Sequence, residues 1–67
     1  MAKITNKFSA HLTEIWDAIE GQSDMRHSNQ KLYKKIYKYY KNTGVIFTGD
    51  SDTDYNVILN YLYEDAS

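Results

Sequence analysis

Residues 31–41 read Lys-Leu-Tyr-Lys-Lys-Ile-Tyr-Lys-Tyr-Tyr-Lys, and this stretch decides the fold class. At 100° per residue, Leu32, Ile36 and Tyr39 fall on one face of a helix, and the lysines fall on the opposite face. This period predicts an amphipathic α-helix. Gly44 follows the stretch at a position where glycine commonly ends a helix.

The helix around this stretch is expected to span residues 24–42. Ser23 can cap its start, because a serine oxygen accepts from the free backbone N–H groups of a first turn. Asn29 is a polar residue on the apolar face. The alternative is therefore a helix that begins at Ser28, with residues 24–27 as a separate turn.

A helix is also expected over residues 6–20, where apolar residues recur every three or four positions. The residues that share its apolar face are Phe8, Leu12, Ile15 and Ile19. Gly21 follows the last of them and can adopt the left-handed conformation of a helix C-cap.

The last helix is expected over residues 52–65. Ser51 and Asp54 match the pattern of a capping box directly before an apolar run. The apolar side chains of that run cover more than half of the helix circumference; they are Tyr55, Val57, Ile58, Leu59, Tyr61, Leu62 and Tyr63. Such a helix is either gripped on two sides or docked onto another molecule.

Residues 45–47, Val-Ile-Phe, have the composition of a β-strand but no partner strand elsewhere in the chain. We expect them to form a short extended linker between the second and third helices that plugs the core. The alternative is an intermolecular strand, added across a dimer or to the sheet edge of a partner.

The expected fold is therefore all-α: a small three-helix domain, with residues 1–67 forming a single helical domain. Its predicted interior consists of Ile4, Phe8, Leu12, Ile15, Ile19, Leu32, Ile36, Val57, Ile58 and Leu62. With 67 residues, such a core supplies a net stability of no more than roughly 3–5 kcal/mol. The chain has no cysteine, which excludes disulfides and cysteine-based zinc sites. No signal peptide or membrane span is evident, so we expect a cytoplasmic protein.

The net charge of −1 conceals a strong separation of charge along the chain. Residues 28–44 carry five lysines and no acid, a charge of +5. Residues 45–67 carry five acids and no base, a charge of −5. The two segments can neutralise each other within one molecule, or pair between chains in a homodimer.

No arrangement of residues predicts a cofactor, a metal site or an enzyme. An EF-hand loop starting at Asp50 requires glycine and glutamate where the chain has Tyr55 and Tyr61. The two histidines, His11 and His27, lie 16 positions apart without a companion ligand. Phosphate-binding glycine loops and nucleophile elbows are absent from the sequence.

The candidate binding surface lies along the helix predicted over residues 24–42. A tyrosine stripe at i, i+4, i+7 spacing borders the lysines, and the predicted partner-binding residues are Tyr33, Lys34, Tyr37, Lys38, Tyr40 and Lys41. Lysines with tyrosines suit an acidic protein surface, where tyrosine is a common anchor. They also suit nucleic acid, through phosphate contacts and base stacking. The structural alternative is that the rings flank a small core while the lysines are merely solvated.

In its Lys-, Asn-, Asp- and Tyr-rich composition, the chain resembles the small accessory proteins of bacteriophages and mobile elements. That resemblance implies a protein that binds and inhibits a host enzyme or defence complex. The sequence thus predicts a non-enzymatic protein-binding module that modulates or inhibits a macromolecular partner. The alternative function is a small nucleic-acid-binding protein that uses the same helix face.

Overall fold

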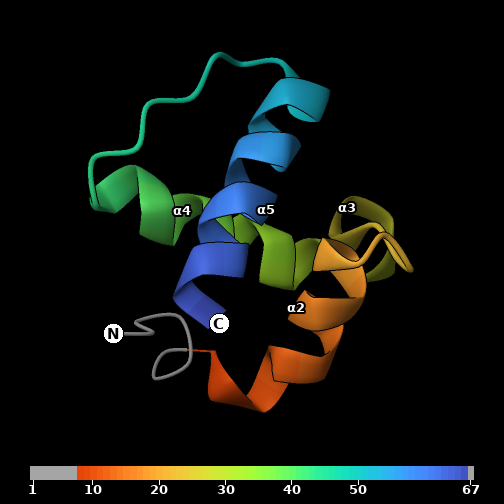
Figure 1. Cartoon of the computed structure of the whole chain (residues 1–67). Helices are drawn as coiled ribbons and strands as arrows, with labels where there is room; N and C mark the ends of the chain where they lie inside the picture. Colours follow the sequence, from red (N-terminus) through yellow and green to blue (C-terminus); the bar gives the residue numbers. More distant parts are fainter. Residues whose placement is uncertain (1–7, 67) are drawn as a thin grey trace.

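The computed structural model describes residues 8–66, and within this range the chain is helical with no strand. The elements, in chain order, are the 3-10 turn η1 (Ser9–His11) and the helices α2 (Leu12–Ile19), α3 (Met25–Ser28), α4 (Gln30–Asn42) and α5 (Ser51–Ala66) (Figure 1). The all-α prediction is confirmed. The predicted count of three helices is not, because the described residues form four α-helices and a 3-10 turn.

The helix predicted over residues 6–20 is shorter and less regular than expected. It starts as η1 and continues as α2, and residues 6 and 7 lie outside the described range. Gly21 ends it as predicted: its φ is +79° and its N–H donates to the carbonyl of Ala18 at 3.2 Å. A left-handed glycine therefore turns the chain toward α3.

The prediction of one continuous helix over residues 24–42 is wrong, because the chain breaks at Asn29 into α3 and α4. The φ and ψ of Asn29 are −154° and 79°, and its side-chain oxygen accepts from the N–H of Leu32 at 3.1 Å. Asparagine favours this capping role over a helix interior. The cap of α3 is Asp24 rather than the predicted Ser23, since its carboxylate accepts from the N–H of Arg26.

The predicted capping box at the start of α5 is also wrong, because Ser51 and Asp54 do not form its hydrogen bonds. Asp50, not Ser51, caps the helix: its carboxylate accepts from the N–H of Thr53 at 2.9 Å. The carboxylate of Asp54 turns back toward the preceding linker instead. There it accepts from the N–H of Thr48 at 2.8 Å and from the N–H of Gly49 at 3.0 Å.

Asp54 is the one buried charged residue of the described chain, with 3% of its surface exposed. Burial would raise the pKa of its carboxyl, but the hydrogen bonds from Thr48 and Gly49 outweigh burial and lower that pKa. The ionised carboxylate thus fastens the end of the linker to the first turn of α5.

The lowered pKa of Asp54 predicts a dependence of stability on pH. Since the folded-state pKa lies below the ordinary 3.8, ionised Asp54 stabilises the fold above that pH, and the contribution disappears as pH falls through the folded-state pKa. Asp54→Asn should lower the Tm at pH 7, and the gap to the wild type should shrink below about pH 4. Asp17→Asn is the control, because no hydrogen bond within residues 8–66 uses that carboxylate. A gap that stays constant from pH 7 to pH 3 would contradict this role.

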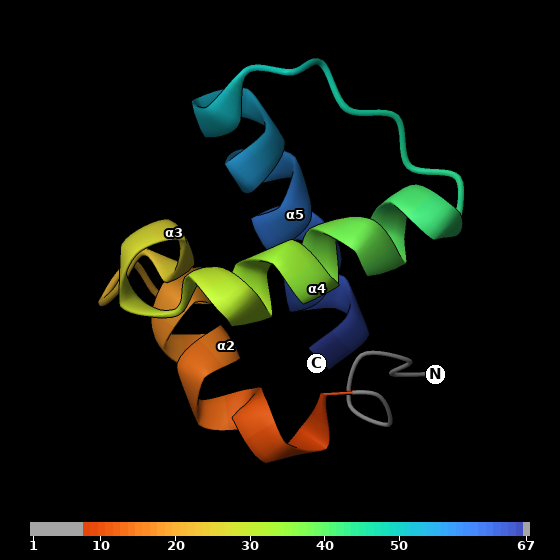
Figure 2. The same cartoon turned by 180° about the vertical axis from the view of Figure 1, so that it is seen from behind.

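Helix α5 packs against both α2 and α4, and α4 runs across it (Figure 1, Figure 2). This arrangement grips the broad apolar face of α5 on two sides. The buried core consists of Phe8, Ile15, Ala18, Met25, Leu32, Ile36, Tyr40, Tyr55, Ile58 and Leu62. Of the predicted interior, Leu12, Ile19 and Val57 are only partly buried, and Ile4 lies outside the described residues.

The linker of residues 43–50 contains neither helix nor strand. Val45 and Phe47 are partly buried against the core, while Ile46 between them is 89% exposed. The ring of Phe47 stacks on that of Tyr37, with 4.2 Å between centroids. The linker is thus held along one edge of α4.

Candidate functional site

The lysines of α4 form one exposed face. They are Lys31, Lys34, Lys35, Lys38 and Lys41, and we call them the lysine face. The opposite side of the helix carries the buried residues Leu32, Ile36 and Tyr40, and α5 packs against α4. Because the two sets occupy opposite sides of one helix, the lysine face is directed away from the core. At 1.5 Å per residue, it is about 15 Å long.

None of these lysines forms an ion pair within residues 8–66. The ion pairs there join Arg26 to Asp24 and Asp52, and His11 to Glu14. The basic segment and the acidic segment therefore do not neutralise each other by direct contact. Five positive charges on one helix repel one another at i, i+3 and i, i+4 spacing, so the lysine face is retained at some cost in stability.

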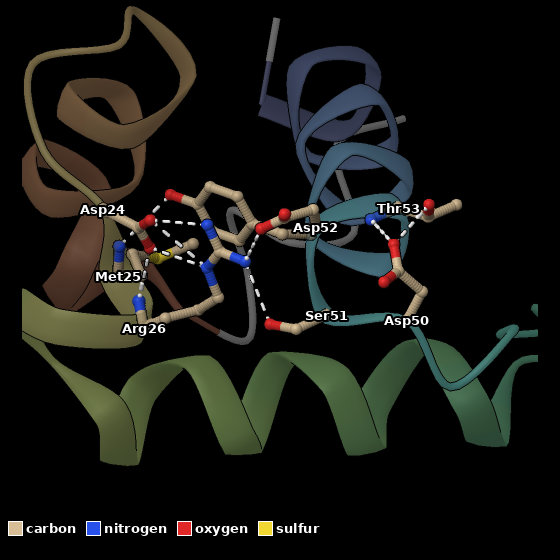
Figure 3. Close-up of polar contacts among 8 residues, drawn as sticks. Asp24, Met25, Arg26, Asp50, Ser51, Asp52 and Thr53 are labelled. Atoms are coloured by element: carbon tan, nitrogen blue, oxygen red, sulfur yellow. Dashed lines mark hydrogen bonds and ion pairs between the residues drawn. The ribbon is translucent and has the colours of Figure 1, made fainter.

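The acidic start of α5 is bound by arginine instead of lysine (Figure 3). The guanidinium of Arg26 donates to Asp52 at 2.8 Å and to Ser51 at 2.9 Å through Nη1, and to Asp24 at 2.7 Å through Nη2. Its hydrogen bonds lower the pKa of the Asp24 carboxyl. Arg26 thus fastens α3 to the first turn of α5.

Tyr55 completes this junction between α3 and α5. Its hydroxyl accepts from the buried N–H of Met25 at 3.1 Å, and the guanidinium of Arg26 lies 4.4 Å from its ring centroid. Burial of the hydroxyl raises the pKa of Tyr55. The junction is structural, because its polar groups are satisfied by one another.

The tyrosine stripe of the predicted surface is largely used inside the molecule. Tyr40 is 3% exposed, and its hydroxyl donates to Asp65 at 2.7 Å. Burial and this carboxylate raise the pKa of Tyr40. Tyr33 and Tyr37 are half-buried and contact each other edge to face at 6.2 Å. Tyr37 is also stacked on Phe47, so one face of its ring is not free to receive a nucleic-acid base.

The structure thus divides the six predicted binding residues. Lys34, Lys38 and Lys41 are exposed on one face, whereas Tyr40 belongs to the core. Tyr33 and Tyr37 are partly buried and contact other rings of the fold. Lys31 and Lys35 were not among the predicted binding residues, but they extend the same exposed face. The helical period of the sequence already places them on the same side as the other lysines.

A hollow of about 540 Å³ adjoins the lysine face near the end of α4. Among the described residues it is lined by Phe8, Lys35, Lys38, Tyr39, Asn42 and Thr43. Sequence reasoning did not predict it, because Phe8 and α4 are brought together only by the fold. The edge-to-face contact of Phe8 and Tyr39, with centroids 5.9 Å apart, forms its aromatic side.

Residues 8–66 contain no group of three or more side chains that could hold a metal ion. In the same range, no helix is long and apolar enough to cross a membrane. Comparisons with protein-family models, curated proteins and solved structures find no match to this chain.

Proposed function

We propose that the protein is a non-enzymatic, cytoplasmic binding module whose lysine face docks on an acidic surface of a partner protein and modulates or blocks that partner. The observation that supports this proposal is the set of five exposed lysines that lack an ion pair within the described residues. A face of one sign attracts a complementary surface, accelerates encounter and selects against partners of like charge. The partly exposed side chains of Tyr33 and Tyr37 add apolar contact at its border.

The resemblance in composition to accessory proteins of bacteriophages and mobile elements supports an inhibitory role. A small rigid helix bundle can cover an acidic site on a larger protein without performing any chemistry of its own. The rigid scaffold reduces the entropy lost on docking, since the lysines already share one helix face.

Nucleic acid is the second candidate partner. It is favoured by one observation: α5, which carries most of the acids of the acidic segment, packs on the side of α4 away from the lysine face. Those acids therefore do not stand directly against a phosphate backbone. Base stacking, however, lacks support, because the rings of Tyr33 and Tyr37 are engaged within the fold. Binding of this kind would rest on phosphate contacts alone.

Titration of labelled probes distinguishes the two partners. We expect a ten-residue polyglutamate peptide to bind more tightly than a 20-base-pair DNA duplex or a 20-nucleotide RNA at 150 mM salt. If nucleic acid is the partner, the duplex binds more tightly, and five phosphate contacts would weaken that binding about 500-fold between 50 and 200 mM salt. Absence of binding by all three probes at 50 mM salt would contradict both functions. Affinity capture with mass spectrometry then identifies the natural partner.

A further inference from the structure

A second concave surface lies between α2 and α5. It is a groove of about 470 Å³, separate from the hollow beside the lysine face. Ile19 and Leu59, which pack against the core, lie at its base. Trp16 from α2 and Tyr63 from α5 form one side, with ring centroids 6.2 Å apart and ring planes at 82°. Rings set nearly at right angles bound a corner rather than a flat surface.

The rim of this groove is polar, and its polar side chains form no hydrogen bond or ion pair with other described residues. Glu20, Asn56 and Asn60 line it and are exposed. No hydrogen bond or ion pair among the described residues uses the side chains of these three. Tyr63 is 57% exposed although its ring contacts that of Trp16. The groove thus offers aromatic faces, one free carboxylate and two free amides.

The charge around the groove is negative. Neither α2 nor α5 contains a lysine or an arginine. Glu20 is the one charged residue among those that line the groove, and no ion pair within residues 8–66 uses its carboxylate. The unpaired carboxylate of Glu20 therefore attracts cations, so the charge at the groove is opposite in sign to that of the lysine face.

We propose that this groove binds a lysine or arginine side chain of a basic peptide segment in a partner protein. A cation is stabilised within about 6 Å of a tryptophan or tyrosine ring, and tryptophan is the best of the aromatic partners. The carboxylate of Glu20 supplies the charge, and the amides of Asn56 and Asn60 supply acceptors for the remaining N–H groups. The proposal is independent of the function assigned to the lysine face, because the two surfaces share no residue.

Trp16 is the single tryptophan of the chain, so its indole N–H resonance and its fluorescence report on this groove alone. The probes are penta-arginine and pentalysine, which contain no aromatic residue, with pentaglutamate as the ligand of opposite charge. At 50 mM salt we expect both basic peptides to shift the Trp16 signal saturably. Pentaglutamate should leave it unchanged.

Two variants locate the binding. Tyr63→Leu removes one ring of the corner and should weaken basic-peptide binding about five- to tenfold. Tyr61→Leu is the matched control, because Tyr61 is on the same helix but contacts Tyr40 and does not line the groove, so its affinity should be unchanged. Glu20→Gln, an exposed and nearly isosteric change, should also weaken binding and keeps the test valid if Tyr63→Leu alters folding.

Three results would overturn the proposal. One is the absence of a Trp16 shift with either basic peptide at millimolar concentration. Another is equal weakening in the Tyr63→Leu and Tyr61→Leu variants. The third is a Trp16 signal that changes with protein concentration without peptide, accompanied by dimers in sedimentation, which would assign the groove to a second copy of this chain.

Discussion

Replacing Ile36 with alanine is expected to unfold most of the protein at 25 °C. Ile36 lies near the middle of α4 with none of its surface exposed. Truncating a buried isoleucine to alanine costs about 2–5 kcal/mol, because transfer energy is lost and a cavity is left behind. A core this small contributes a net stability of no more than roughly 3–5 kcal/mol. Circular dichroism at 222 nm during urea titration measures the loss.

Ile46→Ala is the matched control for that variant, because it deletes the same atoms from an isoleucine that is 89% exposed. Its stability should stay within about 0.5 kcal/mol of the wild type. Comparable losses at the two positions would mean that residues 36 and 46 are buried to the same extent, which contradicts the described packing.

The Lys34→Glu, Lys38→Glu double variant is expected to bind an acidic partner at least about a hundredfold more weakly than the wild type. It removes two attractive charges and places two like charges against the partner, and such juxtapositions cost several kcal/mol. Both positions are exposed, so the helical circular dichroism should not change. Isothermal titration with the polyglutamate probe measures the effect.

Two further double variants distinguish the effect of net charge on binding from the effect of where the charges lie. Lys34→Gln with Lys38→Gln lowers the net charge by two and should weaken binding about tenfold. Thr13→Glu with Gln22→Glu also lowers it by two, at exposed positions outside α4, and should weaken binding less than about twofold. Equal losses in the two pairs would assign binding to overall charge and not to the lysine face.

Periodicity was sufficient to predict the helical class and the faces of α4. Leu32 and Ile36 are buried and the lysines exposed, as the 3.6-residue period requires. A break in this helix was predicted only as an alternative, with the second helix starting at Ser28, whereas the structure starts it at Gln30 with Asn29 as its cap. Its side chain also donates to Glu14 at 2.7 Å, a contact with another helix that local sequence does not specify.

Tyrosine was the residue type that sequence reasoning placed least well. Tyr40 and Tyr55 are buried because their hydroxyls meet Asp65 and the N–H of Met25, which are 25 and 30 residues away along the chain. A buried tyrosine requires such a partner, and only the tertiary fold supplies it. The same limit applies to Arg26, whose contact with Asp52 spans 26 residues.

The sequence correctly separates a basic segment from an acidic one, but a count of charges could not predict which groups the acids would contact in the fold. The sequence permitted lysines that pair with the acidic segment, and the structure instead pairs Asp52 with Arg26 and uses Asp50 and Asp54 to hold the start of α5. Each of the three carboxylates at the start of α5, those of Asp50, Asp52 and Asp54, thus accepts a hydrogen bond from another residue of the protein. The lysines of α4 are left without an ion pair within residues 8–66.

The most direct test of that claim needs no partner. Lys34→Gln with Lys35→Gln removes charge from the middle of α4, where the helix dipole acts weakly, and relieves several like-charge pairs of about 0.2–0.5 kcal/mol each. If the lysine face is unpaired within the protein, this variant should be about 1 kcal/mol more stable than the wild type at 10 mM salt, and the difference should vanish at 1 M salt. A variant less stable than the wild type at 10 mM salt would show that the lysines are already neutralised within the chain.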